Sequence, residues 1–439
     1  MAFKQVRLGD YFNFEKGLGY KGEFLVEDSE IALIGMDSHE EGGGYKEGSE
    51  KFYTGPYRTE HVAEVGDVIF AGTEQGFGLL ASPLIVPESE RFNTYLFSGD
   101  VLKAIPLKPD EFSVEYLYNM YRVDKFRIKT AYGDTGTTVR RISHENFAEQ
   151  LVPLPELSTQ LAINEIISLI DQQIANNKAL SRNLEALAQS LFKSWFIDFD
   201  PVHAKKNGEK PFGMDTETAN LFPDSFVKSE LGDIPKGWKV RPVGDVLTLQ
   251  GGYAFKSSTW TSSGVPVIKI GSVKPGFVDL NEGSFVSLEL GSGVSDTYRL
   301  PRGSMVIGLS GYVGEVGLVP GVSPAPLLNQ RVAKFGLTSG EWKIPFAYCL
   351  TRDSRFKLDV INAAVGSAQQ NVSNGQILNI ERILPPSNLI EVFDSLFHPT
   401  FERILILEEE KMTLSKLIDS ILPQLVDGSL EISSESIAS

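Results

Sequence analysis

The feature that most constrains this 439-residue chain is a module that occurs twice. Gly9-Asp10 and the loop from Gly17 to Lys21 recur 235 residues later, as Gly244-Asp245 and Gly252 to Lys256. Near the ends of the two copies the offset is 230 residues, as in these pairs: Ile142-Ser143 with Val372-Ser373, and Leu154-Pro155 with Leu384-Pro385. A nearly constant offset over such a span predicts two similar domains, because unrelated coincidences would not keep register.

A long helix is predicted after each module. Apolar residues recur at spacings of three and four from Ile163 to Trp195 and again from Phe393 to Leu425. Such spacing over about five heptads is typical of a coiled-coil seam. Asn177 and Lys411 lie at or near this seam, where they either fix the register or sit on a solvated flank.

The two predicted helices differ in their prolines. No proline interrupts the first, whereas the second contains Pro399, which would break it near its start, and Pro423, which would kink it near its end. Between the first helix and the second module, residues 198–236 are rich in charge, Gly and Pro and are expected to be an exposed connector.

Each module is predicted to be mixed α/β with short strands. Apolar runs bounded by Gly, Pro, Ser or Asp indicate the strands; they are Ile31–Ile34, Val65–Phe70, Val265–Ile270 and Met305–Leu309. Helical spacing over 113–129 and 344–362 predicts one helix near the end of each module.

Composition favours a cytoplasmic globular protein. No stretch approaches the ~20 apolar residues that span a bilayer, and residues 1–6 lack the apolar core of a signal peptide. The single cysteine, Cys349, fits a reducing compartment, and its apolar surroundings predict a buried, inert thiol.

The net charge of −16 argues mildly against nucleic-acid binding, but the charge is uneven. Residues 238–385 hold 14 Lys and Arg against 10 Asp and Glu, a balance of +4, whereas residues 1–155 hold 16 against 25, a balance of −9. Within the first module, the stretch from Arg122 to Arg141 is locally basic and allows a basic face on an acidic body.

The chain is predicted to have no catalytic residues and no metal site. Gly17 to Gly22 has dinucleotide-binding spacing, but such a site needs a following helix, and Glu23 to Asp28 is too short and acidic to form one. The second copy loses the pattern at Ala254. The five histidines have no metal-ligand spacing, and there is no phosphate-binding loop or nucleophile elbow.

Polar loops shared by the two modules are the candidate binding sites. Lys21 and Lys256 each follow an aromatic residue and flexible glycines, which would let backbone approach a ligand while the lysine meets phosphate. An ordinary glycine turn with a solvated lysine is the alternative. A further loop, from Leu309 to Gly314, is interpreted as a structural Gly-rich hairpin.

A second pair of loops differs in chemistry between the copies. Arg140 and Arg141 in the first copy are matched by Gln369, Gln370 and Asn371 in the second. Arg reads guanine and Gln or Asn reads adenine through paired hydrogen bonds, so two readers of different sequences would differ in this way. Alternatively, both loops only buttress the junction to the helix, with the arginines touching backbone phosphate.

The run Phe192-Lys193-Ser194-Trp195-Phe196-Ile197-Asp198-Phe199-Asp200-Pro201-Val202 resembles the central region of specificity subunits of Type I restriction–modification enzymes. The resemblance extends to Leu151 to Pro155, to Gly366 to Ser373 and to the two-module layout. It implies two target recognition domains that each read half of a bipartite double-stranded DNA sequence. It also implies that the paired helices dock methyltransferase subunits, for which we select Leu184, Leu187, Leu191 and Trp195.

The resemblance further implies that the chemistry belongs to partners. Methyltransferase subunits would use S-adenosylmethionine, and a restriction motor–nuclease subunit would use ATP and Mg, with no cofactor on this chain and no membrane partner. The cellular role would be phage defence. Two alternatives stay open: a non-catalytic coiled-coil scaffold that binds proteins, and the specificity subunit of a methylation system without classical restriction.

We therefore predict an α+β fold class, with two similar mixed α/β target recognition domains separated by two long antiparallel helices and related by a pseudo-two-fold axis. The predicted boundaries are recognition domain 1 at 1–155, spacer helix 1 at 156–197, a linker at 198–235, recognition domain 2 at 236–386, spacer helix 2 at 387–428 and a tail at 429–439.

Overall fold

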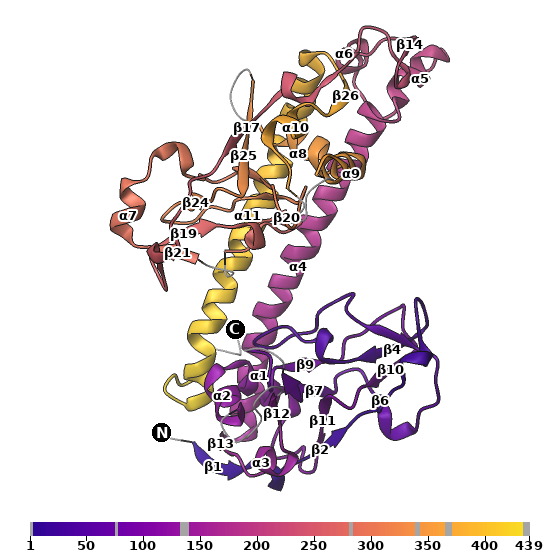
Figure 1. Ribbon diagram of the computed structural model, residues 1–439. Coiled ribbons are helices and arrows are strands. Elements are labelled where there is room, and N and C mark those ends of the chain that lie inside the picture. Colours follow the sequence, from indigo (N-terminus) through magenta and orange to yellow (C-terminus); the bar gives the residue numbers. More distant parts are fainter. Residues whose placement is uncertain are drawn as a thin grey trace. The chain divides into compact units, whose positions relative to one another are not determined.

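The computed structural model describes residues 3–74, 78–131, 140–280, 284–338, 343–364 and 371–432. The chain divides into two compact units (Figure 1). Unit 1 comprises Met1–Ile174 and Thr413–Ser439, and unit 2 comprises Ala175–Met412. Each unit therefore contains one module together with a piece of both long helices.

The module of unit 1 is built on two sheets. One sheet has the order β2 (Phe12–Lys16), β11 (Val101–Pro106), β7 (Val68–Ala71), β9 (Pro83–Ile85). The other has the order β3 (Leu25–Val26), β5 (Lys51–Tyr53), β4 (Ile31–Ile34), β10 (Thr94–Phe97), β6 (Val62–Ala63). A third pairing joins β1 (Lys4–Arg7) to β13 (Leu151–Leu154), so the two ends of the module meet.

The module of unit 2 repeats this topology. Its first sheet has the order β17 (Leu247–Gly251), β25 (Val332–Leu337), β22 (Met305–Gly308), β23 (Val316–Leu318), β20 (Gly276–Phe277). Its second has the order β18 (Trp260–Thr261), β21 (Ser284–Val286), β19 (Val265–Ile268), β24 (Leu327–Leu328). The ends again pair, through β16 (Lys239–Pro242) and β26 (Glu381–Leu384). The prediction of a duplicated α/β module is confirmed.

The apolar runs became strands because both faces of each are covered. All four residues of β7 and of β22 are buried, which explains runs without alternation. The parallel pairing of β4 with β10 recurs as that of β19 with β24. Buried aliphatic and aromatic side chains from these strands form the centre of each module.

Each module carries two helices where the sequence predicted one. Unit 1 has α1 (Val114–Arg122) and α2 (Asp124–Ala131), and unit 2 has α8 (Pro345–Arg352) and α9 (Ser354–Ala363). Val123 and Asp353 are extended at the breaks. The Asp353 carboxylate accepts a hydrogen bond from the backbone N–H of Arg355 at 3.0 Å and so begins a new helix.

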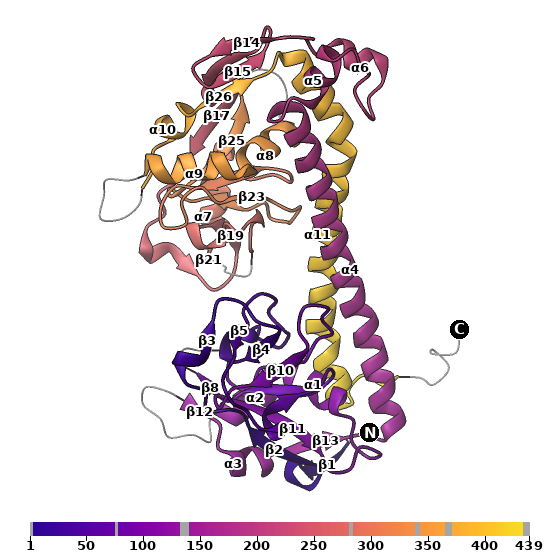
Figure 2. The ribbon, with the colours of Figure 1, turned by 90° about the vertical axis from the view of Figure 1, so that its right-hand side faces the viewer.

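The two long helices, α4 (Leu157–Phe196) and α11 (Ser387–Asp427), lie side by side (Figures 1 and 2). In unit 1, Ile163 near the start of α4 packs in one core with Leu422 near the end of α11. In unit 2, Phe192 near the end of α4 packs against Phe393 near the start of α11. The helices are therefore antiparallel, as predicted.

The predicted break at Pro399 is wrong, because α11 continues through both Pro399 and Pro423. Phe397 and Phe401 are buried on either side of Pro399, so packing holds the helix where proline removes one hydrogen bond. Asn177 is buried in the seam and donates to Glu410 Oε2 at 3.1 Å, whereas Lys411 pairs with Glu408 of its own helix.

The segment 198–235 is not an exposed connector. It forms α5 (Asp200–Lys206), α6 (Thr216–Asn220) and a hairpin of β14 (Phe226–Ser229) with β15 (Gly232–Pro235). Phe222 is buried with Trp195 of α4 and with Trp238, their ring centroids 5.4 and 6.4 Å from that of Phe222. Apolar residues interspersed with the charged ones thus attach this segment to the core of unit 2.

One buried carboxylate on α11 predicts a pH dependence. Asp394 is 4% exposed and accepts the backbone N–H of Phe346 at 2.9 Å, and burial raises its pKa to about 6. Because this pKa lies above the unfolded value, the folded state binds more protons, and stability falls as pH rises from about 4 to about 6.

Asp394→Asn keeps a side-chain oxygen that can accept the Phe346 N–H and removes the negative charge. We expect it to raise the free energy of unfolding at pH 8 by about 1–3 kcal/mol and to flatten the profile between pH 4 and 6, in urea titrations across pH. Asp419→Asn, the same substitution at an exposed position of the same helix, serves as the control. If Asp394→Asn lowered the free energy of unfolding equally at pH 4 and pH 8, burial would not disfavour the charged form of Asp394.

Candidate nucleic-acid interface

Arg141 and Asn371 occupy the same place in the two modules. Arg141 pairs with Thr73, through β12 (Arg140–Arg141) and β8 (Thr73–Glu74), and Asn371 forms a backbone bridge with Ser310. Both partners stand just beyond a central strand, β7 in unit 1 and β22 in unit 2. The sequence offset of 230 therefore corresponds to a common backbone position.

The residue after each of these is an anchor. Ile142 N–H donates to the Gly72 carbonyl at 2.8 Å, and Val372 N–H donates to the Leu309 carbonyl at 2.9 Å. Both side chains are buried, at 6% and 5% exposure. A fixed backbone thus supports Arg141 and Asn371, which are exposed.

A capped helix begins directly after each anchor. The Ser143 hydroxyl accepts from the backbone of α3 (His144–Ala148), and the Ser373 hydroxyl does the same for α10 (Asn374–Leu378). These caps, two residues after Arg141 and Asn371, fix the residue at which each helix begins. Gln369 and Gln370 lie outside the described residues, as does the side chain of Arg140.

Lys21 and Lys256 are also equivalent. Each precedes a single 3-10 turn, η2 (Gly22–Phe24) and η6 (Ser257–Thr259), and each is exposed. The ammonium of Lys21 lies 3.7 Å from the Glu23 carboxylate. No α-helix follows Gly22 before β3, so the dinucleotide-binding spacing there lacks the helix N-terminus that a pyrophosphate needs.

The glycines of these loops approach the protein's own backbone. A Cβ on Gly17 would lie 1.9 Å from the Phe97 carbonyl oxygen, and one on Gly252 would lie 2.1 Å from the Asn329 carbonyl oxygen. The interpretation that these two glycines let backbone approach a ligand is therefore wrong. They close the loop onto the end of a sheet strand in both modules.

Gly17→Ala is expected to lower the free energy of unfolding by more than about 2 kcal/mol, because its Cβ would overlap backbone that cannot retreat. Gly19→Ala is the matched control, since a Cβ there meets nothing within 4 Å. Chemical denaturation of both variants measures the difference. Equal stability of the two would mean that the loop moves freely.

The basic stretch predicted near the end of module 1 is mostly committed to internal contacts. Arg122 binds Asp171 through two hydrogen bonds of 2.6 and 3.0 Å, and Lys125 lies 3.0 Å from the Asp427 carboxylate. Arg127 donates to the backbone carbonyls of Tyr121 and Arg122 at 3.0 and 2.7 Å. These three side chains therefore hold α1 and α2 in place and do not form the predicted basic face.

The four residues selected for partner docking have different surroundings. Trp195 is 5% exposed in the aromatic core of unit 2, and Leu184 and Leu191 pack against that core. Leu187 is 58% exposed. Only Leu187 keeps the surface that a partner chain would need, and docking there stays a prediction.

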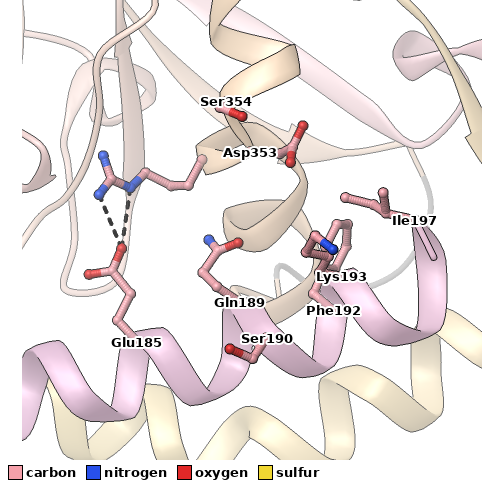
Figure 3. Close-up of a pocket in the computed structure, with 9 residues that line it drawn as sticks. Glu185, Gln189, Ser190, Phe192, Lys193, Ile197, Asp353 and Ser354 are labelled. Atoms are coloured by element: carbon pink, nitrogen blue, oxygen red, sulfur yellow. Dashed lines mark hydrogen bonds and ion pairs between the residues drawn. The ribbon is translucent and has the colours of Figure 1, made fainter. Parts of the chain in front are cut away.

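A polar cleft of about 310 Å³ borders the C-terminal half of α4 (Figure 3). Glu185 and Gln189 project from α4 toward Asp353 and Ser354 at the start of α9. Glu185 Oε1 accepts from Arg352 at 3.1 and 3.3 Å. The buried Nε2 of Gln189 has no acceptor within the described residues, so the cleft offers an unused hydrogen-bond donor.

The remaining candidate chemistries find little support. Cys349 is fully buried, and burial raises the pKa of its thiol well above the usual value. Among the described residues, no group of three or more His, Cys, Asp and Glu side chains could hold a metal ion. Within the same residues, no helix is both long and apolar enough to cross a membrane.

Comparison with known families decides among the interpretations. The sequence model of the Type I restriction modification DNA specificity domain matches residues 3–186 and 235–394, which is more than half of the chain. The chain belongs to this family. It is a specificity subunit of a Type I restriction–modification system, a component for DNA recognition that carries no catalysis of its own.

Two relatives of this specificity subunit come from different organisms. It is 27% identical over 325 residues to the Type I restriction enzyme MjaIX specificity subunit of Methanocaldococcus jannaschii, covering 72% of this chain and 69% of that one. It is 25% identical over 340 residues to the HindI specificity subunit of Haemophilus influenzae, covering 67% and 72%. Both matches cover most of the relative.

A solved structure shares the fold. The S subunit of a Type I restriction–modification system from M. genitalium superposes with a TM-score of 0.55 at 14% identity, covering 98% of this chain and 97% of that one. The fold class predicted from the sequence, α+β with two similar mixed α/β domains and two long antiparallel helices, is therefore confirmed.

Sequence reasoning treated one loop of the specificity subunit as purely structural, the hairpin from Leu309 to Gly314. The bridge between Ser310 and Asn371 places that hairpin beside the candidate reading position. The repeat gave no signal for it, because Thr73 and Ser310 correspond at an offset of 237, which places Tyr312 on Gln75 of module 1.

Proposed function

We propose that the two modules are target recognition domains, each reading one half of a bipartite site in double-stranded DNA. The observation that carries this proposal is the structural equivalence of Arg141 and Asn371. An arginine suits guanine and an asparagine suits adenine, because each can form paired hydrogen bonds to that base in the major groove. Two equivalent positions with different chemistry are what two half-sites of different sequence require.

Lysine contacts would supply the part of binding that does not depend on sequence. Lys21 and Lys256 are exposed and lie at the same position of each module, where an ammonium can neutralise phosphate. Joining two recognition domains in one chain makes the second half-site contact intramolecular, so two weak contacts act together. The antiparallel pairing of α4 with α11 connects them.

The chemistry would belong to partner subunits. Methyltransferase subunits would bring S-adenosylmethionine and the pocket that accepts a flipped adenine, and a restriction motor–nuclease subunit would bring ATP and Mg. On this chain, Leu187 and the Gln189 cleft are the surfaces of α4 offered to a methyltransferase subunit. Such a complex would work in the cytoplasm, where it meets invading DNA.

Reconstitution tests this proposal. The chain alone should bind no S-adenosylmethionine and transfer no methyl group, and transfer to adenine should begin when methyltransferase subunits are added. DNA affinity of the complex should fall steeply as salt rises, because each phosphate contact releases counterions. Methyl transfer to the same sites without this chain, or an affinity independent of salt, would contradict the proposal.

A further inference from the structure

The loop between β22 and β23 exposes an aromatic ring. Tyr312 is 64% exposed, more than any other tyrosine among the described residues. A single exposed tyrosine is unremarkable by itself. Two further features distinguish Tyr312: the backbone of its loop is fixed, and the loop is hydrogen-bonded to the segment that carries Asn371.

The backbone of the loop is fixed. Gly311 and Gly314 adopt left-handed φ values of 70° and 81°, which side chains other than glycine rarely adopt. Gly308 N–H donates to the Glu315 carbonyl at 3.0 Å, and Gly314 N–H donates to the Gly308 carbonyl at 3.1 Å. These contacts close a tight hairpin whose conformation does not depend on the tyrosine ring.

The residue after the tyrosine is the anchor of the hairpin. Val313 is 4% exposed and packs in the core of unit 2, and Gly314 lies against Val360 of α9. Since Val313 holds the loop from within, burying Tyr312 is not needed for stability. The hairpin therefore holds the phenol ring outward on a firm base.

The hairpin that carries the ring is joined to the candidate reading position. Ser310, two residues before Tyr312, forms the backbone bridge to Asn371, and Leu309 accepts the backbone N–H of Val372 at 2.9 Å. The two loops are thus tied together by backbone contacts. Any duplex that reaches the Asn371 amide also comes near the hairpin tip.

The chemistry of the side chain fits a DNA contact. Tyr312 presents a large, mostly apolar ring that stability does not require to be buried. A ring suits DNA of any sequence, because every base and sugar presents an apolar face to it.

We propose that Tyr312 is a DNA-contacting residue of module 2, whose ring packs against a base or sugar beside the bases that Asn371 faces. This inference rests on the proposed function. It assigns the ring to affinity and to the placement of the duplex, while the amide of Asn371 supplies the choice of base.

A crosslinking experiment tests the contact directly. Cys349 is the only cysteine of the chain and is fully buried, so Tyr312→Cys creates the only exposed thiol. The variant, assembled with methyltransferase subunits, is mixed with duplexes that carry a disulfide-activated tether at successive positions of the site. We expect rapid crosslinking from a few adjacent positions in one half-site. Phe212→Cys, at a fully exposed position of the 198–235 segment, is the control and should not crosslink.

Affinity gives a second readout. Tyr312→Ala should weaken binding of the complex to its site about tenfold, the loss expected for one base–ring contact, while Tyr312→Phe stays within about threefold. Thermal unfolding of both should match wild type, since the ring is exposed. Crosslinking no better than that of Phe212→Cys, or an unchanged affinity of Tyr312→Ala, would overturn the inference.

The failure of this inference is separable from the failure of the proposed function. If Asn371→Ala weakens binding and Tyr312→Cys does not crosslink, the interface stands and only the role of the tyrosine is refuted. If neither Asn371→Ala nor Tyr312→Ala changes DNA affinity, both the proposed interface and the role of Tyr312 are refuted.

Discussion

Phe393→Ala is expected to lower the free energy of unfolding by about 3–5 kcal/mol, the usual cost of removing a fully buried aromatic ring. Phe393 is 0% exposed on α11. Its ring centroid lies 5.8 Å from those of Phe192 and Trp195, and 5.3 Å from that of Phe196. These three rings come from α4, so the truncation leaves a cavity where the two long helices meet within unit 2.

The matched control lies one turn further along the same helix. Leu396 is 53% exposed, and Leu396→Ala should cost less than about 1 kcal/mol. Urea denaturation followed by circular dichroism measures both variants. Equal losses for Phe393→Ala and Leu396→Ala would mean that helical propensity, rather than packing of α4 on α11, stabilises this region.

The second large effect concerns recognition. Arg141→Ala and Asn371→Ala should each weaken binding of the cognate duplex by about 1–3 kcal/mol, the typical discrimination of one paired contact to a base. The two substitutions should relax different halves of the target, because the residues belong to different modules. Both side chains are exposed, so either substitution should change the free energy of unfolding by less than about 1 kcal/mol.

Competition with partly scrambled duplexes measures this. For the Arg141→Ala complex, scrambling one half of the site should cost little further affinity, and for the Asn371→Ala complex the same should hold for the other half. Lys228→Ala, a loss of charge at a position 92% exposed in the β14–β15 hairpin, is the control. Relaxation of the same half by both variants would refute the assignment of one half-site to each module.

The duplication was predictable because both copies keep the residues on which the fold depends. Gly17 and Gly252 close equivalent loops, and the buried runs of β7 and β22 occupy equivalent strands. Ser143 and Ser373 cap equivalent helices. Such positions tolerate few residue types, so the offset between copies remains visible in the sequence.

Features that depend on distant contacts were not predictable. The sequence gives no local reason for α1 to end at Val123 or for 198–235 to fold, and both depend on packing against other elements. The arginines of module 1 were interpreted as a basic face because their carboxylate partners, such as Asp171, lie far along the chain. Spacing alone cannot reveal such pairings.

The candidate site was predicted in part. The sequence identified Arg141 and Asn371 as corresponding positions, and the structure places both on equivalent backbone. It did not identify Tyr312, because a glycine-rich hairpin looks structural until its neighbour across the fold is known. Leu184, Leu191 and Trp195 were selected by helical spacing, which does not distinguish a core face from a docking face.

Mapping of modified adenines in the host genome, with and without this gene, tests the central claim most directly. The account predicts a split motif, two short specific sequences separated by an unspecified gap, whose methylation disappears when the gene is deleted and returns with the intact gene. Methylation that persists after deletion, or a lost motif that is continuous rather than split, would contradict it.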